Sequence, residues 1–170
     1  MLLPGFEPAP VAAALARELR AEIEAFHTEY CAVLDEGRIA DWPQFFAEDA
    51  VYRITARENA DAHLPVGLIY CEGIGMLRDR AFAIAKTAMF APRHLLHLVG
   101  NVRVLSAAGD IVAAQSNYIV LQTLVEERTT IHQAGRYFDR FRRRDGALRL
   151  VERHCVYESS IIDNALVFPV

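Results

Sequence analysis

The sequence predicts an α+β domain shaped like a cone, with N-terminal helices packed on a long curved antiparallel sheet. Two observations predict this fold class. Apolar residues recur every three or four positions as far as about residue 33, the spacing of an amphipathic helix, whereas from about residue 93 they follow the period of two that is typical of strands. Helices followed by a run of strands form an α+β layout, in which the helices gather on one face of the sheet.

Length and composition fit one domain with a large apolar core. The chain has 170 residues, 53% of them hydrophobic, and a mean hydropathy of +0.13. No run approaches the roughly 18 apolar residues that a membrane span needs, so we expect no membrane association. The surplus of apolar residues therefore indicates a buried subunit interface, a large core, or both. A net charge of −4 argues against a nucleic-acid partner.

The cysteines and the N-terminus predict the compartment. Cys31, Cys71 and Cys155 are far apart and form no CxxC or CxH spacing, so neither a zinc nor an iron–sulfur site is expected in this chain. Scattered cysteines in apolar contexts fit the reducing cytoplasm. Residues 1–10 contain three prolines and no basic region, which argues against a signal peptide. We expect an irregular arm over residues 1–10 and a single domain over residues 11–170.

The first elements follow from helical spacing and helix-ending signals. A first helix is predicted by an apolar face formed by Val11, Leu15, Leu19, Ile23, Phe26, Tyr30 and Val33. Gly37 is expected to end it as a C-terminal cap. A short aromatic helix with Trp42, Phe45 and Phe46 should follow, and then a strand over residues 50–56.

The middle of the chain is predicted as a loop, a strand and a helix. Residues 57–65 are polar and rich in turn formers, which favours a loop, and residues 66–72 form a short apolar run that favours a second strand. Residues 73–86 show helical spacing, and Pro92 interrupts the chain soon after them.

Four strands are then expected at about residues 93–105, 111–125, 129–143 and 147–158. Ala108-Gly109-Asp110 and Asp145-Gly146 are turn signals between adjacent strands and predict antiparallel hairpins. The link at residues 126–128 carries a weaker turn signal.

A metal-free acid–base site can be assembled from four residues of this layout. His94 and His97 lie three apart in a predicted strand and should point to opposite faces, which disfavours a shared metal ion. Tyr30 on the first helix, Tyr52 on the first strand, and His97 and His132 on later strands could meet inside the cone. Tyrosine with histidine suits proton abstraction next to a carbonyl, or dehydration. The competing interpretation is that all four are hydrogen-bonded core residues.

Arginines crowd the last predicted hairpin, at positions 136, 140, 142, 143 and 144. They could form a positive patch for a carboxylate or an acidic partner, or simply pair with neighbouring acids such as Asp139 and Asp145. Arg136, between Gly135 and Tyr137 in mid-strand, is the one expected to make a salt bridge to a partner subunit.

Four segments in register resemble the small (beta) subunit of bacterial aromatic-ring-hydroxylating dioxygenases. Each segment matches a motif of that family, and together they span about residues 15–170. They are the Trp42-Pro43 helix with FFAEDAVYRI, GMLRDR (75–80), RHLLHLVGNVRV (93–104), and the tail from Leu148, with Glu152-Arg153, Asp163-Asn164 and a closing Pro169. The stretch at residues 57–73 is more similar to beta subunits of oxygenases for aromatic acids, such as salicylate or terephthalate.

The resemblance implies the cone fold of nuclear transport factor 2 and ketosteroid isomerase. It implies an assembly with a large alpha subunit, commonly α3β3, in which the alpha chain carries the Rieske [2Fe–2S] cluster and a mononuclear Fe(II). This chain would then hold no cofactor and would be a non-catalytic subunit of an NADH- and O2-dependent oxidoreductase in aromatic catabolism.

Subunit contacts are expected from five positions: Trp42, Arg78, Arg80, Arg136 and Pro169. The alternative is a stand-alone dehydratase or isomerase of the same fold that uses Tyr30, Tyr52, His97 and His132.

Overall fold

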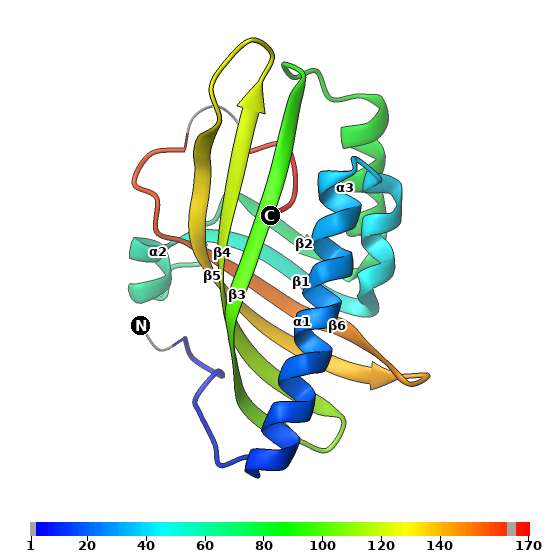
Figure 1. The fold of residues 1–170 in the computed structure, drawn as a ribbon, viewed down its shortest axis with the longest axis vertical. Coiled ribbons are helices and arrows are strands. Elements are labelled where there is room, and N and C mark those ends of the chain that lie inside the picture. The colour runs from blue at the N-terminus through cyan, green and yellow to red at the C-terminus, as the bar shows by residue number, and fades with distance from the viewer. Residues whose placement is uncertain (1–2, 163–165) are drawn as a thin grey trace.

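A curved six-stranded sheet with strand order β2-β1-β6-β5-β4-β3 is the main element of the computed structural model, which describes residues 3–162 and 166–170. Helix α1 lies across one face of the sheet in Figure 1, with α3 beside it at the end where β1 and β2 lie. The predicted fold class, helices on a curved sheet, is confirmed.

The strands of the second half form the predicted meander. They are β3 (Arg93–Ala108), β4 (Ile111–Leu124), β5 (Thr130–Arg144) and β6 (Ala147–Tyr157), and each pairs antiparallel with the next. The expectation of a wholly antiparallel sheet is wrong at one pairing, because β1 (Phe46–Ala56) runs parallel to β6. The chain leaves β1 through β2 and α3, reaches the far edge, and returns through the meander, which brings β6 back beside β1 in the same direction.

Helix α1 (Ala13–Asp35) ends as predicted at Gly37, which has the positive φ of +71° that glycine adopts without strain. The N–H of Gly37 donates to the Leu34 carbonyl and that of Arg38 to the Val33 carbonyl, the pattern of a Schellman cap. The apolar face is shorter than predicted. Leu15 is 42% exposed and burial begins at Leu19, since the first turns lie at the extremity of the molecule in Figure 1.

Three predicted boundaries are wrong. The short helix is a 3-10 helix, η1 (Ile39–Phe45), and β1 begins at Phe46 rather than at residue 50 because Phe46 already pairs with Leu150 of β6. The loop predicted at residues 57–65 begins with a short helix, α2 (Arg57–Asp61), in which Arg57 pairs with Asp61 at 3.3 Å. Strand β2 covers only Ile69–Glu72, whereas α3 (Gly73–Lys86) has the predicted bounds.

The N-terminal arm covers part of the sheet face that looks away from α1. Leu3 and Phe6 are buried against Ala113 and Phe138 in a second apolar cluster, and the Arg140 guanidinium lies 4.5 Å from the Phe6 ring centroid. Along β4, Ile119 has the same strand parity as Ala113 and therefore lies on the same face. Beyond the arm, this face exposes Leu96, Leu98, Ile119 and Ile131 on three neighbouring strands.

Within the described residues, no helix combines the length and the apolarity that crossing a membrane requires. The Asp163-Asn164 pair of the predicted tail motif lies outside the described residues.

Candidate functional site

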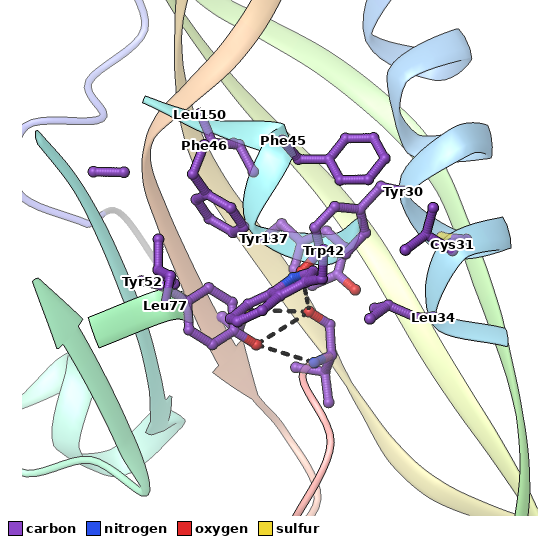
Figure 2. Close-up of a cluster of buried hydrophobic side chains, with 14 of the residues drawn as sticks. Tyr30, Cys31, Leu34, Trp42, Phe45, Phe46, Tyr52, Leu77, Tyr137 and Leu150 are labelled. Atoms are coloured by element: carbon purple, nitrogen blue, oxygen red, sulfur yellow. Dashed lines mark hydrogen bonds between the residues drawn. The ribbon is translucent and has the colours of Figure 1, made fainter. Parts of the chain in front are cut away.

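The tail segment, residues 166–170, runs into the concave side of the sheet and binds both tyrosines of the predicted acid–base site. The hydroxyls of Tyr30 and Tyr52 donate to the main-chain oxygen of Val170, at 3.2 and 3.3 Å, and the Val170 N–H donates to the Tyr52 hydroxyl at 3.0 Å. Trp42 Nε1 donates to the Tyr30 hydroxyl at 2.9 Å (Figure 2). The structure therefore brings Tyr30 and Tyr52 together, but around a residue of the chain itself.

The aromatic side chains around this point form a closed layer. Tyr30, Trp42 and Tyr52 are each 0% exposed, and Figure 2 shows them meeting beneath Phe45 and Phe46. The Trp42 ring makes edge contacts with Phe46 and Tyr52, both at 5.2 Å between centroids. Aromatic pairs in this geometry stabilise a core beyond their buried area, so these rings act as packing elements.

Burial also sets the protonation state of the two tyrosines. It raises the pKa of Tyr30, which the nearby Arg153 cation only partly opposes, and it raises the pKa of Tyr52 well above its ordinary value. A general base needs a pKa close to the working pH. Both hydroxyls are therefore neutral donors, suited to holding the tail segment and unsuited to proton abstraction.

On the side that carries His132, the tail segment leaves too little space for a substrate. The crevice that residues 166–170 leave against Val120 and His132 measures about 10 Å³, close to the minimum for one water molecule. Small-molecule sites usually measure about 300–1,000 Å³. His132 thus lies next to the tail segment, in a space that holds no substrate-sized cavity.

His97 lies elsewhere, between β3 and the end of α1. Its Nδ1 is 2.6 Å from Asp35 Oδ1, and its main-chain N–H donates to both oxygens of the same carboxylate. His94, on the opposite strand face, is exposed, as the strand alternation predicts. A groove of about 670 Å³ opens there between α1 and β3–β4, and its lining includes His97 but neither Tyr30 nor Tyr52. The four predicted residues do not line one cavity.

An ion pair that the sequence analysis did not identify lies at the centre of the core. Arg153 donates to both oxygens of Asp139, at 2.9 and 2.8 Å, and its guanidinium lies between the Tyr30 and Tyr137 rings, 4.2 and 4.1 Å from their centroids. Burial disfavours its charge, but the Asp139 carboxylate raises the pKa of Arg153 well above the ordinary value. The pair is therefore charged, and both Asp139 oxygens are hydrogen-bonded, while Arg153 Nη1 has no hydrogen-bond partner among the described residues.

His27 completes this buried network. Its Nδ1 is 3.2 Å from Arg153 Nη2 and its Nε2 is 3.0 Å from Ser116 Oγ. Burial, assisted by the Arg153 cation, lowers the pKa of His27 well below its ordinary value, so the ring is neutral, with Nδ1 accepting and Nε2–H donating. One signal for the network was present in the sequence: Asp139 has the same strand parity as the inward aromatics Tyr137 and Phe141.

The five predicted contact residues occupy different environments. Trp42 and Pro169 are buried within this chain. Arg80 is half-buried and donates to the carbonyl oxygens of Leu166 and Val167, which ties the tail segment to α3. Arg136 pairs with Glu158 at 2.7 Å. Arg78 is 65% exposed and is 3.9 Å from the nearest oxygen of Glu48.

No group of three or more histidine, cysteine or acidic side chains among the described residues is arranged to hold a metal ion.

Comparison with known proteins gives the family. Residues 31–164 match the profile described as "ring hydroxylating beta subunit". The small subunit of anthranilate 1,2-dioxygenase from Burkholderia cepacia is 31% identical, covering 88% of this chain and 92% of that subunit. A beta subunit of the terephthalate 1,2-dioxygenase oxygenase component from Comamonas sp. is 29% identical, covering 87% of this chain and 96% of the relative.

Comparison with solved structures agrees with this family assignment. The beta subunit of a candidate aromatic-ring-hydroxylating dioxygenase from Novosphingobium aromaticivorans superposes with a TM-score of 0.83 at 36% identity, covering 91% of this chain and 98% of the other. A candidate scytalone dehydratase from the same organism has a TM-score of 0.65 at 18% identity, with 82% and 83% coverage, and shows the shared fold alone.

Proposed function

This chain belongs to the ring-hydroxylating beta-subunit family, and from that premise we propose that it is the non-catalytic structural subunit of a multicomponent aromatic-ring-hydroxylating dioxygenase. It would assemble with an iron-bearing large subunit, in an α3β3 hexamer, in the cytoplasm. The Rieske [2Fe–2S] cluster and the mononuclear Fe(II) would belong to the large subunit, and the substrate would be an aromatic acid.

The main support for a structural role is that the interior tyrosines are already hydrogen-bonded within the chain. Tyr30 and Tyr52, the residues that a Tyr/His enzyme would need free, are hydrogen-bonded to Val170 of the same chain. Both tyrosines are 0% exposed, and the crevice between the tail segment and the strand that carries His132 measures only about 10 Å³. An acid–base mechanism needs a bound substrate within hydrogen-bond reach of the catalytic groups, and that position is filled.

The exposed apolar side chains support an assembling role. Leu96, Leu98 and Ile131 are between 50% and 65% exposed. They are close neighbours, since Leu96 and Ile131 both pair with Leu121 across the sheet. Exposed apolar patches on a folded domain commonly mark contacts with other proteins.

Co-expression with the large subunit tests the proposal. We expect a complex containing equal numbers of the two chains, with all of its iron bound to the large chain. A native mass measurement and an iron determination would establish both. If the chain purifies as an iron-free homo-oligomer in the presence of a folded large subunit, the proposal is wrong.

A further inference from the structure

We infer that a cationic pocket beside the β5–β6 hairpin receives an acidic segment of the large subunit; the inference rests on the proposed function. The pocket has a volume of about 650 Å³ and lies between η1, the start of α3 and the hairpin turn. Its cations are Arg78, Arg144 and Arg149. We name it the arginine pocket.

Most arginines of the hairpin are already paired tightly with acids of this chain. Arg136 lies 2.7 Å from Glu158, and Arg143 lies 2.6 Å from Glu22. Arg142 lies 3.1 Å from Asp49, and Arg140 pairs closely with Glu152. Each of these four side chains therefore already has a close carboxylate within the chain, although Glu152 and Glu158 are shared with Arg53 and Arg57.

The three arginines of the pocket are not paired in this way. Arg78 is 3.9 Å from Glu48, and Arg144 is 3.8 Å from Asp145; both distances exceed hydrogen-bond range, and all four side chains are at least 65% exposed. Arg149 donates to the neighbouring Leu148 carbonyl at 3.2 Å, and among the residues the structure describes no carboxylate lies within 4 Å of its guanidinium. These groups retain the capacity to bind another carboxylate.

The sign of the charge identifies the chemistry of the occupant. The chain as a whole carries −4, yet the pocket lining has three arginines against two acids, Glu48 and Asp145. Guanidinium groups bind carboxylates through paired, charge-assisted hydrogen bonds. The first turn of α3, which also borders the pocket, contains no acidic residue and no side-chain cap. Its free N–H groups add to the positive potential.

The shape favours a protein segment over a single small anion. Apart from Gln44, the remaining lining is apolar, with Pro43, Phe46, Ile74 and Ala147 among its members. A space of about 650 Å³ exceeds what one carboxylate fills, whereas a short acidic stretch could place its carboxylates on the arginines and its methylene groups on this floor. Complementary charge of this kind fixes the orientation of two subunits and accelerates their association.

A matched pair of variants tests the pocket in the assembled complex. Arg149→Gln removes a charge of the arginine pocket, and Arg143→Gln removes a neighbouring charge that Glu22 already balances. The dissociation constant of the complex would be measured by dilution at 50 and 500 mM NaCl, with urea unfolding of each variant as the folding control. A charge reversal, Arg144→Glu, tests a second arginine of the pocket, whose side chain is 69% exposed.

We expect Arg149→Gln and Arg144→Glu to weaken the complex about 10-fold or more at 50 mM NaCl, and much less at 500 mM because salt screens the charges. Arg143→Gln should change the dissociation constant less than about 2-fold, because Arg143 lies outside the arginine pocket and exposed charges of this kind contribute little.

Equal affinities for Arg149→Gln and the wild type, with assembly intact, would overturn the inference and leave the proposed function standing. Failure of the wild-type chain to assemble would instead overturn the proposed function. Free benzoate provides the third arm: if it binds the isolated chain through Arg149 and Arg149→Gln leaves assembly unchanged, the pocket is a small-molecule site and the inference is wrong.

Discussion

The interior of the cone and the arginine pocket use similar chemical groups in opposite ways. Inside, Arg153 is matched by Asp139, and the Tyr30 and Tyr52 hydroxyls are matched by Val170, all at 1% exposure or less. At the surface, Arg78, Arg144 and Arg149 have no carboxylate within hydrogen-bond distance among the described residues. The interior polar groups hydrogen-bond to one another and stabilise the fold, whereas the arginines of the pocket remain available to bind another molecule.

This difference explains how a fold shared with a dehydratase can serve as a subunit. An acid–base enzyme needs free polar groups facing an internal cavity. Here the tail segment occupies the interior, so the groups available for recognition lie on the outside. We therefore expect surface substitutions to change the function of this chain, and interior substitutions to change its stability.

The largest effect is expected from the central ion pair. Arg153→Leu leaves Asp139 buried without its partner and should lower the free energy of unfolding by about 3–5 kcal/mol. Urea unfolding of the purified chain would measure it. Arg143→Leu is the control: it breaks an exposed pair with Glu22 and should cost less than about 1 kcal/mol. If the two variants lose similar free energies of unfolding, the buried pair contributes no more to stability than an exposed one.

The contact with the tail segment should have the next largest effect. Tyr52→Phe removes the hydroxyl that binds Val170 and leaves the buried Val170 N–H without its acceptor, which should cost about 1–3 kcal/mol. Tyr70→Phe removes an exposed hydroxyl bonded to Glu72 and should change stability by less than about 0.5 kcal/mol. An unchanged urea midpoint for Tyr52→Phe would mean that the tail segment is not held as described.

The pH dependence should show a smaller effect of the same interior burial. Burial, assisted by the Arg53 cation, lowers the pKa of His154 to about 3 from its usual 6.5. Between these values the unfolded chain binds a proton that the folded chain does not, so stability is complete above about pH 6.5 and falls on acidification. His154 alone should account for about 1–2 kcal/mol of lost stability between pH 7 and pH 5.

His154→Gln separates this contribution from those of other groups. The wild type and the variant would be unfolded in urea at a series of pH values, and the difference between the two curves should shrink on acidification. Parallel curves would show that His154 titrates alike in the folded and unfolded chains.

The sequence predicted what local patterns determine. Gly37 ended α1 as expected, and the four meander strands fell within a few residues of their predicted positions, helped by the Gly and Asp that two of their three turns carry. The parallel β1–β6 pairing could not be predicted in this way, since it depends on where the chain returns rather than on any local pattern. The same holds for the Arg153–Asp139 pair, which joins neighbouring strands in mid-sheet.

The tail segment illustrates the limit most clearly. Its sequence shows only apolar residues and a proline, yet Val170 contacts Tyr30 and Tyr52, 140 and 118 positions away. Sequence reasoning could name the tyrosines as a pair that meets inside the cone, but not the residue that fills the space between them.

The turnover of the assembled oxygenase carrying Tyr30→Phe and Tyr52→Phe in this chain tests the central claim most directly. The complex would be purified intact, and its oxygen consumption with an aromatic acid measured per iron-loaded large subunit. If the interior tyrosines only hold the fold, turnover should stay within about 2-fold of wild type while the melting temperature falls. A loss of 10-fold or more in an intact complex would contradict the account and make these tyrosines part of the chemistry.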